Sequence, residues 1–333
     1  INADRLRADF DNLSEIGSTL SGGITRLALS NEDLEARAWF AERIEEAGLL
    51  VRDDEVGNLS GVLLSDQPGA KTFLMGSHLD TVPNGGKYDG TIGVLAALEC
   101  LRTIKEAGLK LPVHLEAINF TDEEGAWHSF FGSMGLVGAL EPIHVNDHQK
   151  DNGAFRVALF RAGIRPSEIQ RARRNPQELA GFLEIHIEQS ERLEKSGKQI
   201  GIVEGIVGRV SYIFTFYGEA AHAATTAFER QRDALQGAAR FISVMHNLAR
   251  ENYPRSIVNC GHVKVSPGAF NVIPSEAALR VDLRHPNSET LAEMESRIIR
   301  LAQEIAREYH LSVNADVVLR RTVARMDTKL SEV

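Results

Sequence analysis

Cysteine and aromatic residues are scarce in this chain, and long apolar runs are missing. Its 333 residues include 2 cysteines, and aromatic residues make up 6%. The two cysteines, Cys100 and Cys260, lie far apart, which excludes a dense disulfide framework and indicates a reducing, cytoplasmic location. No apolar run approaches the ~18 residues that a membrane helix requires, so we expect no membrane partner.

Positive charge is also in the minority. Lysine and arginine number 37 against 46 aspartate and glutamate residues, which gives a net charge of −9. Such a surface argues against a polyanionic partner such as nucleic acid. With 43% hydrophobic and 25% charged residues, the composition is globular and excludes disordered, collagen-like and coiled-coil chains. A chain of this length is expected to form about two domains.

Strands alternate with helices in the first part of the chain. Residues 31–48 are predicted to be helical because Ser30 or Asn31 can cap the start, an apolar face follows, and Gly48 can end the helix. A second helix is predicted over 91–107. Strands are predicted over 59–64, 72–75, 113–120 and 181–187. This alternation is typical of βαβ units and predicts an α/β domain with a mostly parallel sheet.

From about residue 208 the predicted order changes to βαββαβ, the ferredoxin-like arrangement of one sheet and two helices. The predicted segments are strand 210–217, helix 230–250, strands 257–265 and 277–283, helix 288–309 and strand 311–319. Glycines within 204–208 relax the backbone at the predicted hinge. The sequence therefore predicts a first domain over 1–207 and a smaller second domain over 208–325.

Histidine and acidic side chains gather around the ends of the first domain's strands. They are His78, Asp80, Asp89, Glu123, Glu124 and His186. Taken singly, a strand-end histidine is more often an ordinary polar residue, paired glutamates are usually solvated, and Gly-Asp loops are mostly turns. Ligands of open α/β sheets gather beyond the carboxyl ends of strands, and imidazole with carboxylate is the usual donor set for zinc or manganese. Together these residues suggest a metal site.

These motifs resemble those of the hydantoinase/carbamoylase group of dinuclear metal amidohydrolases, within the aminoacylase and carboxypeptidase superfamily. The group includes N-carbamoyl-L-amino-acid hydrolases, allantoate amidohydrolases and some β-ureidopropionases. The matching segments are His78-Leu79-Asp80, Asp89-Gly90, Glu123-Glu124-Gly125, 184–189 (EIHIEQ), 218–223 (GEAAHA), 267–274 (PGAFNVIP) and Asp282-Leu283-Arg284. The resemblance implies a zinc-peptidase-like catalytic domain with an inserted ferredoxin-like lid and dimerisation domain, and a return to the catalytic domain over 326–333.

The resemblance also implies a role for each matching residue of the first domain. His78, Asp89 and His186 would hold one divalent metal, and Asp89 would bridge to a second metal held by Glu124. Asp80 would hydrogen-bond His78 and fix its tautomer. Glu123 would be the general base. Zinc or manganese is expected at both sites, and such ligands also accept cobalt.

Substrate contacts are implied mainly for the second domain. His222, Asn271 and Arg284 would reach the substrate, often across the interface of a homodimer, and Gln189 would contribute from the catalytic domain. Arg284 suits a carboxylate because a guanidinium forms two parallel hydrogen bonds with it. His222 would stabilise the oxyanion that forms when water attacks.

The pattern departs from the group in two respects. Relatives continue beyond the residue equivalent to Val333 and supply a histidine ligand of the second metal, so we expect this sequence to be a fragment. The alternative is a second metal site that lacks its last ligand. Alanine at 224, phenylalanine at 228 and tryptophan at 127 replace residues common in relatives, which would reshape the substrate pocket.

The sequence therefore predicts a metal-dependent hydrolase of linear, non-peptide C–N bonds, acting on an N-carbamoyl-L-amino acid or a similar ureido acid. Allantoate cleavage is an alternative within the group. A dipeptidase or aminoacylase is a second alternative, although peptide-cleaving relatives usually have a carboxylate at the position of His186. A catalytically dead scaffold is the third.

Overall fold

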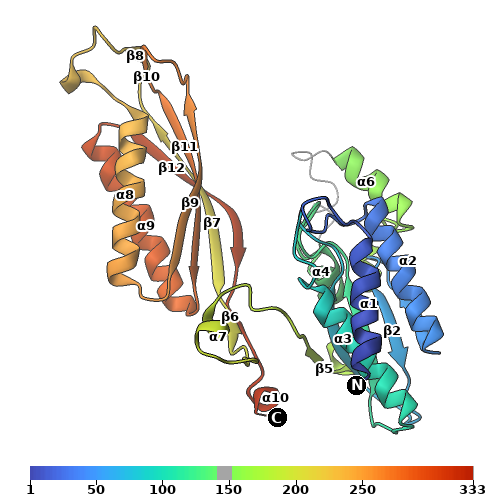
Figure 1. The fold of residues 1–333 in the computed structure, drawn as a ribbon. Helices are drawn as coiled ribbons and strands as arrows, with labels where there is room; N and C mark the ends of the chain where they lie inside the picture. Colours follow the sequence, from blue (N-terminus) through green and yellow to red (C-terminus); the bar gives the residue numbers. More distant parts are fainter. Residues whose placement is uncertain (141–151, 333) are drawn as a thin grey trace. The chain divides into compact units, whose positions relative to one another are not determined.

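The computed structural model describes residues 1–140 and 152–332, which fall into two compact units. Unit 1 covers Ile1–Arg192 and unit 2 covers Leu193–Val333, and each is described by itself (Figure 1). Within the described ranges, no helix has the length and apolar character needed to span a membrane.

Unit 1 is built on a five-stranded sheet in the order β1-β2-β4-β3-β5. The strands are β1 (Leu50–Asp53), β2 (Leu59–Leu63), β3 (Thr72–His78), β4 (His114–Phe120) and β5 (Leu179–Leu183). β3 lies parallel to both β4 and β5, whereas β1 pairs with β2 and β2 with β4 in antiparallel fashion. The α/β fold class is confirmed, but the sheet is mixed rather than mostly parallel because the β1–β2 hairpin forms its edge.

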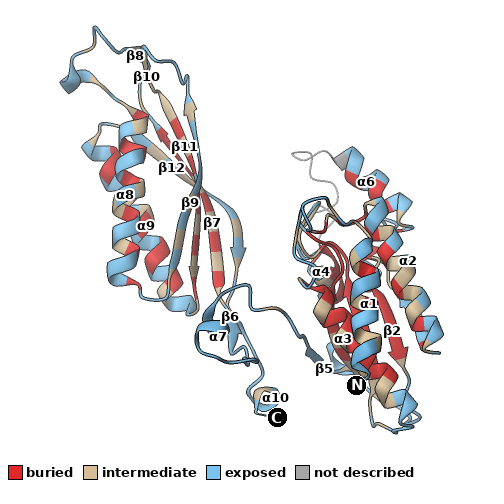
Figure 2. Cartoon of the chain, in the orientation of Figure 1, coloured by how far each residue is buried: buried red, intermediate tan, exposed pale blue. Residues whose placement is uncertain are grey.

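Two predicted helices of unit 1 form close to their expected bounds. Ser30 caps α2 (Asn31–Glu46) by accepting the backbone N–H of Asp33, and α3 (Thr91–Glu106) begins after Gly90. The apolar faces of both helices join a buried core with β2 and β4 (Figure 2). Residues Ala3–Glu15 form α1, which was not predicted. The smaller helices are α4 (Phe131–Val137), α6 (Asn152–Arg161), η1 (Ile169–Ala172) and η2 (Pro176–Glu178).

The strand predicted over 181–187 is shifted in the structure. β5 ends at Leu183, where its pairing with Met75 of β3 also ends, so residues 184–189 leave the sheet. The chain then runs close to the first turn of α3, because a Cβ built on Gly93 would lie 2.7 Å from the carbonyl oxygen of Ile185. This path brings His186 toward the loop that precedes α3.

Unit 2 contains the predicted βαββαβ order. Its elements are β7 (Gly208–Tyr217), α8 (Ala234–Asn252), β9 (Ile257–Ser266), β11 (Glu276–His285), α9 (Ser288–Glu308) and β12 (Ser312–Arg321). The sheet order is β12-β7-β11-β9 and every neighbouring pair is antiparallel. Both helices pack on one face of this sheet, where Phe241 of α8 and Ile298 of α9 share a buried core with Phe214 of β7 (Figures 1 and 2).

Short elements flank this sheet at both ends. β8 (Ala221–His222) pairs with β10 (Val272–Ile273), and β6 (Gly205–Ile206) pairs with β13 (Ala324–Arg325). The other short helices of unit 2 are α7 (Arg192–Lys195), η3 (Phe228–Arg230) and α10 (Thr328–Ser331). Domain boundaries at 207 and 325, and a return to the catalytic domain over 326–333, stay predictions.

Candidate metal centre and its surroundings

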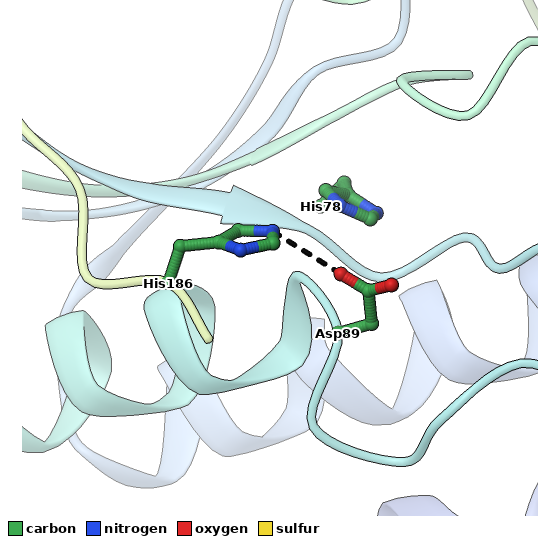
Figure 3. Close-up of side chains that lie close together, drawn as sticks. All are labelled: His78, Asp89 and His186. Carbon is green, nitrogen blue, oxygen red and sulfur yellow. Dashed lines mark ion pairs between the residues drawn. The ribbon is translucent and has the colours of Figure 1, made fainter. Parts of the chain in front are cut away.

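Three of the predicted ligands lie together in unit 1. The ligand atoms of His78, Asp89 and His186 all fall within 4.8 Å of one another (Figure 3). The Nε2 atom of His186 lies 3.2 Å from Oδ1 of Asp89, and the two imidazole rings are 6.0 Å apart between centroids. Within residues 1–140 and 152–332, this is the group of histidine, cysteine and acidic residues close enough to hold a metal ion.

Each ligand comes from a different segment. His78 is the last residue of β3, Asp89 precedes α3, and His186 follows β5. Gly90 makes the close approach possible: its φ is +67°, and a Cβ there would lie 2.4 Å from Nε2 of His78. Only a residue without a side chain fits this position without displacing the imidazole.

The donor set fits a divalent transition metal. Nδ1 of His78 lies 2.8 Å from the carbonyl oxygen of Asp80, and Nδ1 of His186 lies 2.9 Å from that of Ile187. A carbonyl oxygen only accepts hydrogen bonds, so each Nδ1 donates, and Nε2 is the atom of the neutral ring left to bind a metal. Two imidazole nitrogens and a carboxylate oxygen are ligands that zinc and manganese accept.

Gln189 contacts the same group. Its side-chain amide donates to both carboxylate oxygens of Asp89, at 3.2 and 3.0 Å. The backbone of Gln189 is left-handed, with φ of +55°, which turns the side chain back after the end of β5. Gln189 is thus beside the ligand group, and its contact with substrate stays a prediction.

The Asp80 carboxylate lies differently from the expected hydrogen bond to His78. Its Oδ1 is 3.8 Å from Nδ1 of His78, which instead donates to the backbone carbonyl of Asp80. The carboxylate accepts the backbone N–H groups of Glu123 and Glu124, at 3.3 and 3.1 Å. Burial and the nearby Asp33 and Asp122 raise the pKa of Asp80 to about 8. Asp80 therefore joins the loop after β3 to the loop after β4.

Glu123 has the environment expected of a general base. It lines a cavity of about 290 Å³ whose walls are largely apolar, including Phe120, Leu136 and Phe182. Burial raises the pKa of Glu123 to about 7, and the electrostatic interaction with His78 opposes this shift. The hydroxyl of Ser133 donates to its Oε2 at 3.2 Å. A carboxyl group with such a pKa can exchange protons near neutral pH.

Glu124 does not join the three-residue ligand group in this structure. Its backbone is fixed by Asp80, while its predicted role as a ligand of a second metal stays a prediction. The three grouped ligands can hold one ion, and Glu124 lies on the adjacent loop.

Asp122 was not singled out from the sequence. Its buried carboxylate accepts the backbone N–H groups of Trp127 and His128, at 3.1 and 2.6 Å, and so closes the loop that carries the glutamate pair. Its φ of +53° is a conformation that aspartate tolerates better than most residues. Its position immediately before two glutamates was the signal available in the sequence.

In unit 2, two of the predicted substrate-binding residues lie together and the third lies apart. His222 is opposite Val272 in the β8–β10 ladder, and the N–H of Ala223 donates to the carbonyl of Asn271 at 3.0 Å. Arg284 lies near the other end of β11, eight residues beyond Glu276, which at ~3.4 Å per residue is about 27 Å along the strand. His222 is exposed.

Arg284 is paired within its own strand. Its Nε and Nη2 atoms lie 2.8 and 2.7 Å from Oδ2 of Asp282, so this edge of the guanidinium binds a carboxylate. The arginines on either side hold the pKa of Asp282 below its usual value against the opposing effect of burial. All the roles of His222, Asn271 and Arg284 toward substrate stay predictions.

Comparison with known proteins assigns the chain to a family. The model of the peptidase family M20/M25/M40 matches residues 74–326. The chain belongs to this family. N-carbamoyl-L-amino acid amidohydrolase of Geobacillus stearothermophilus is 36% identical over 318 residues, covering 95% of this chain and 78% of the relative. Allantoate amidohydrolase of Bacillus subtilis is 32% identical over 321 residues, covering 96% and 77%.

A solved member of the family has the same architecture. The crystal structure of a hydantoinase/carbamoylase family amidase from Burkholderia phymatum superposes with a TM-score of 0.84 at 32% identity, covering all of this chain and 81% of that one. The resemblance read from the motifs is therefore confirmed. The expected enzyme class, an amidohydrolase, is confirmed with it.

Proposed function

We propose that the protein removes the carbamoyl group of an N-carbamoyl-L-amino acid or a similar ureido acid, in a metal-dependent reaction. The observation that carries this proposal is the convergence of His78, Asp89 and His186 beside a half-buried carboxyl group, Glu123, whose pKa is near neutral. The relatives named as N-carbamoyl-L-amino acid and allantoate amidohydrolases support the reaction class.

Each residue around the proposed metal centre has a separate role. His78, Asp89 and His186 would hold a divalent ion, which supplies Lewis acidity toward a carbonyl oxygen when it is bound. Glu123 takes a proton from the attacking water and passes it to the leaving nitrogen. Asp80 keeps the backbone of Glu123 in place. Hydrolysis of a terminal carbamoyl group then yields ammonia, carbon dioxide and the free amino acid.

Two metal ions per subunit belong to the same proposal. Glu124, held by Asp80 on the loop of Glu123, would bind the second ion together with Asp89. Zinc or manganese suits these nitrogen and oxygen donors, and cobalt is accepted by the same set. The metal content of the purified protein, measured before and after chelation, tests the number and the identity.

A homodimer is proposed from the distances within unit 2. Arg284 would bind the substrate carboxylate, whereas His222 and Asn271 lie in the segment around the β8–β10 ladder, beyond Glu276, which is itself about 27 Å from Arg284 along β11 at ~3.4 Å per residue. A small ureido acid cannot contact both places of one subunit. The contacts of one substrate are therefore shared, with Arg284 from one subunit and His222 from its partner. We also propose a cytoplasmic location, supported by the free thiols of Cys100 and Cys260.

Ammonia release tests the proposed reaction. The protein, loaded with Mn²⁺ or Zn²⁺ and compared with a chelated control, is incubated with N-carbamoyl-L-amino acids, β-ureidopropionate, allantoate and dipeptides. We expect chelator-sensitive ammonia from at least one ureido acid. Glu123→Gln should lower kcat on the order of 10²-fold or more, the loss typical of a positioned base. Glu35→Gln, a change of an exposed acid on α2, is the matched control.

The outcomes separate the alternatives. Release from allantoate in preference to the carbamoyl amino acids selects the substrate of the Bacillus subtilis relative. Cleavage of dipeptides alone contradicts the proposal and assigns the protein to peptide hydrolysis. If the protein binds no divalent ion and cleaves none of the tested compounds, it is a catalytically dead scaffold.

A further inference from the structure

Three arginines form one row across the sheet of unit 2. Arg321 of β12 lies opposite Arg209 of β7, and Arg209 lies opposite Arg284 of β11. Directly opposed residues of antiparallel strands point to the same face. The neighbours Val210 and Leu283 are buried in the core that α8 and α9 cover, so the arginine row lies on the other face.

The row places positive charges side by side on one face of the sheet. Like charges directly opposite each other on a sheet are destabilising. Asp282 bridges two of the arginines, with Oδ1 2.8 Å from Nε of Arg209 and Oδ2 2.8 Å from Nε of Arg284. Arg209 and Arg284 share this one carboxylate, so the three side chains together carry a net charge of +1, which suits an anionic ligand.

Asp282 also orients the two guanidiniums. It occupies the Nε edge of both Arg209 and Arg284, and the hydroxyl of Ser211 donates to its Oδ1 at 3.2 Å. The side chain of Asp282 is 18% exposed, whereas those of Arg209 and Arg284 are 41% and 37% exposed. The Asp282 carboxylate is therefore more buried than the two guanidiniums on either side of it. The remaining N–H groups of these guanidiniums are accessible and suit an anion that accepts two hydrogen bonds.

We propose that Arg209 is a second substrate-binding residue beside Arg284, and that the preferred substrate is an N-carbamoyl amino acid with a carboxylate in its side chain. The inference rests on the proposed function, because Arg284 is taken as the anchor of the α-carboxylate. Neighbouring strands lie ~4.8 Å apart, and the short side chain of an acidic amino acid separates its two carboxylates by a similar distance. Arg209 therefore selects for the second carboxylate.

Isosteric substrate pairs test the selectivity without any mutation. N-carbamoyl-L-glutamate and N-carbamoyl-L-glutamine differ in one charged group at nearly constant shape. We expect kcat/KM of the metal-loaded protein to be about 10-fold or more higher for the glutamate compound, expressed mainly in KM, since a charge-assisted Arg–carboxylate contact is lost with the amide. A ratio of one or less overturns the inference.

Variants assign the selectivity to Arg209. Arg209→Gln should reduce the ratio to within about 3-fold of one, and Arg209→Lys should keep part of it, because lysine retains the charge without the planar fork. Arg300→Gln, on the exposed surface of α9, removes the same charge and should leave the ratio unchanged. An unchanged ratio in Arg209→Gln contradicts the proposal even where the protein prefers the acidic substrate.

Calorimetric binding of the two compounds to the metal-loaded protein separates this inference from the proposed reaction. If the protein binds the glutamate compound more tightly but turns over neither compound, and if Arg209→Gln removes this binding preference, the reaction is refuted and the anion site is supported. Turnover of the glutamine compound with no preference for glutamate supports the reaction and refutes the role of Arg209.

Discussion

The carboxylate of Asp80 accepts the backbone N–H of Glu124 at 3.1 Å, and its second oxygen accepts that of Glu123 at 3.3 Å. The side chain of Asp80, two residues after the predicted ligand His78, thus holds the proposed base Glu123, which follows the neighbouring strand. Because the backbone carbonyl of Asp80 accepts from Nδ1 of His78 while its side chain holds the loop of Glu123, Asp80 couples the positions of the predicted ligand and the proposed base.

Asp80→Asn tests this coupling. Asparagine offers a single acceptor oxygen to two N–H donors, so the loop of Glu123 loses one hydrogen bond. We expect kcat to fall roughly 10- to 100-fold, within the range lost with acid–base groups, while the metal affinity changes only a few-fold. Turnover at saturating metal and metal titration are the two measurements. Strongly weakened metal binding with normal kcat at saturation would instead place the role of Asp80 at His78.

Gly90→Ala should disrupt the ligand group. The new Cβ would lie 2.4 Å from Nε2 of His78, and the φ of +67° is unfavourable for alanine. We expect a loss of metal affinity of at least 10-fold, comparable to the loss on removing a residue that orients a ligand. Gly86→Ala, in the same loop, meets no atom within 4 Å and serves as the control. Equal metal affinity in the two variants would refute this packing argument.

The metal-free protein should become less stable as the pH rises from about 6 to about 8.5. Burial raises the pKa of Asp80 to about 8 and of Glu123 to about 7, above their values in the unfolded chain. The folded state therefore binds more protons in this range, and each such proton changes the unfolding free energy by about 1.4 kcal/mol per pH unit.

Denaturant unfolding of the chelated protein at several pH values measures this slope. Asp80→Asn, which cannot ionise, should show a shallower dependence than the wild type. A wild-type stability that increases over this pH range, or a variant with an unchanged slope, contradicts the assigned pKa directions.

Mixed dimers provide a test of shared sites. His222→Ala and Arg284→Ala should each be nearly inactive alone, since each removes a proposed substrate contact. When the two variants are unfolded and refolded together, a symmetric dimer with shared sites should regain roughly a quarter of wild-type activity, because half of the dimers contain one intact site. No recovery would show that both residues serve the site of their own subunit.

Much of the fold follows from local sequence patterns. Ser30 as a cap and Gly48 as a stop predicted α2, and the βαββαβ order of the segments from residue 208 onward predicted the second sheet, which includes β7 and β11. Helix α1 was missed because its attachment is non-local: the buried carboxylate of Asp9 pairs with Arg102 of α3 at 2.5 Å. The antiparallel β1–β2 edge depends likewise on pairing that periodicity does not show.

The candidate site was predicted less completely than the fold. Strand-end positions suggested that histidine and acidic residues gather at one edge of the sheet, and the structure brings His78, Asp89 and His186 together. The sequence overestimated the length of β5 and placed His186 within a strand. The hydrogen bonds of Asp80 were not foreseen, because the two N–H donors belong to residues more than forty positions away. Contacts of that kind arise only when loops of separate strands meet.

Along the ten residues of β11, successive side chains alternate between the two faces of the unit 2 sheet. β7 flanks this strand along its whole length, and β9 flanks it on the other side apart from one register shift between Arg280 and Val281. A single-residue insertion between that shift and Arg284 that keeps the regular pairing would turn the guanidinium toward the helices. An odd change of length in this stretch therefore removes Arg284 from the face that carries Arg209, whereas an even change keeps both arginines on the same face.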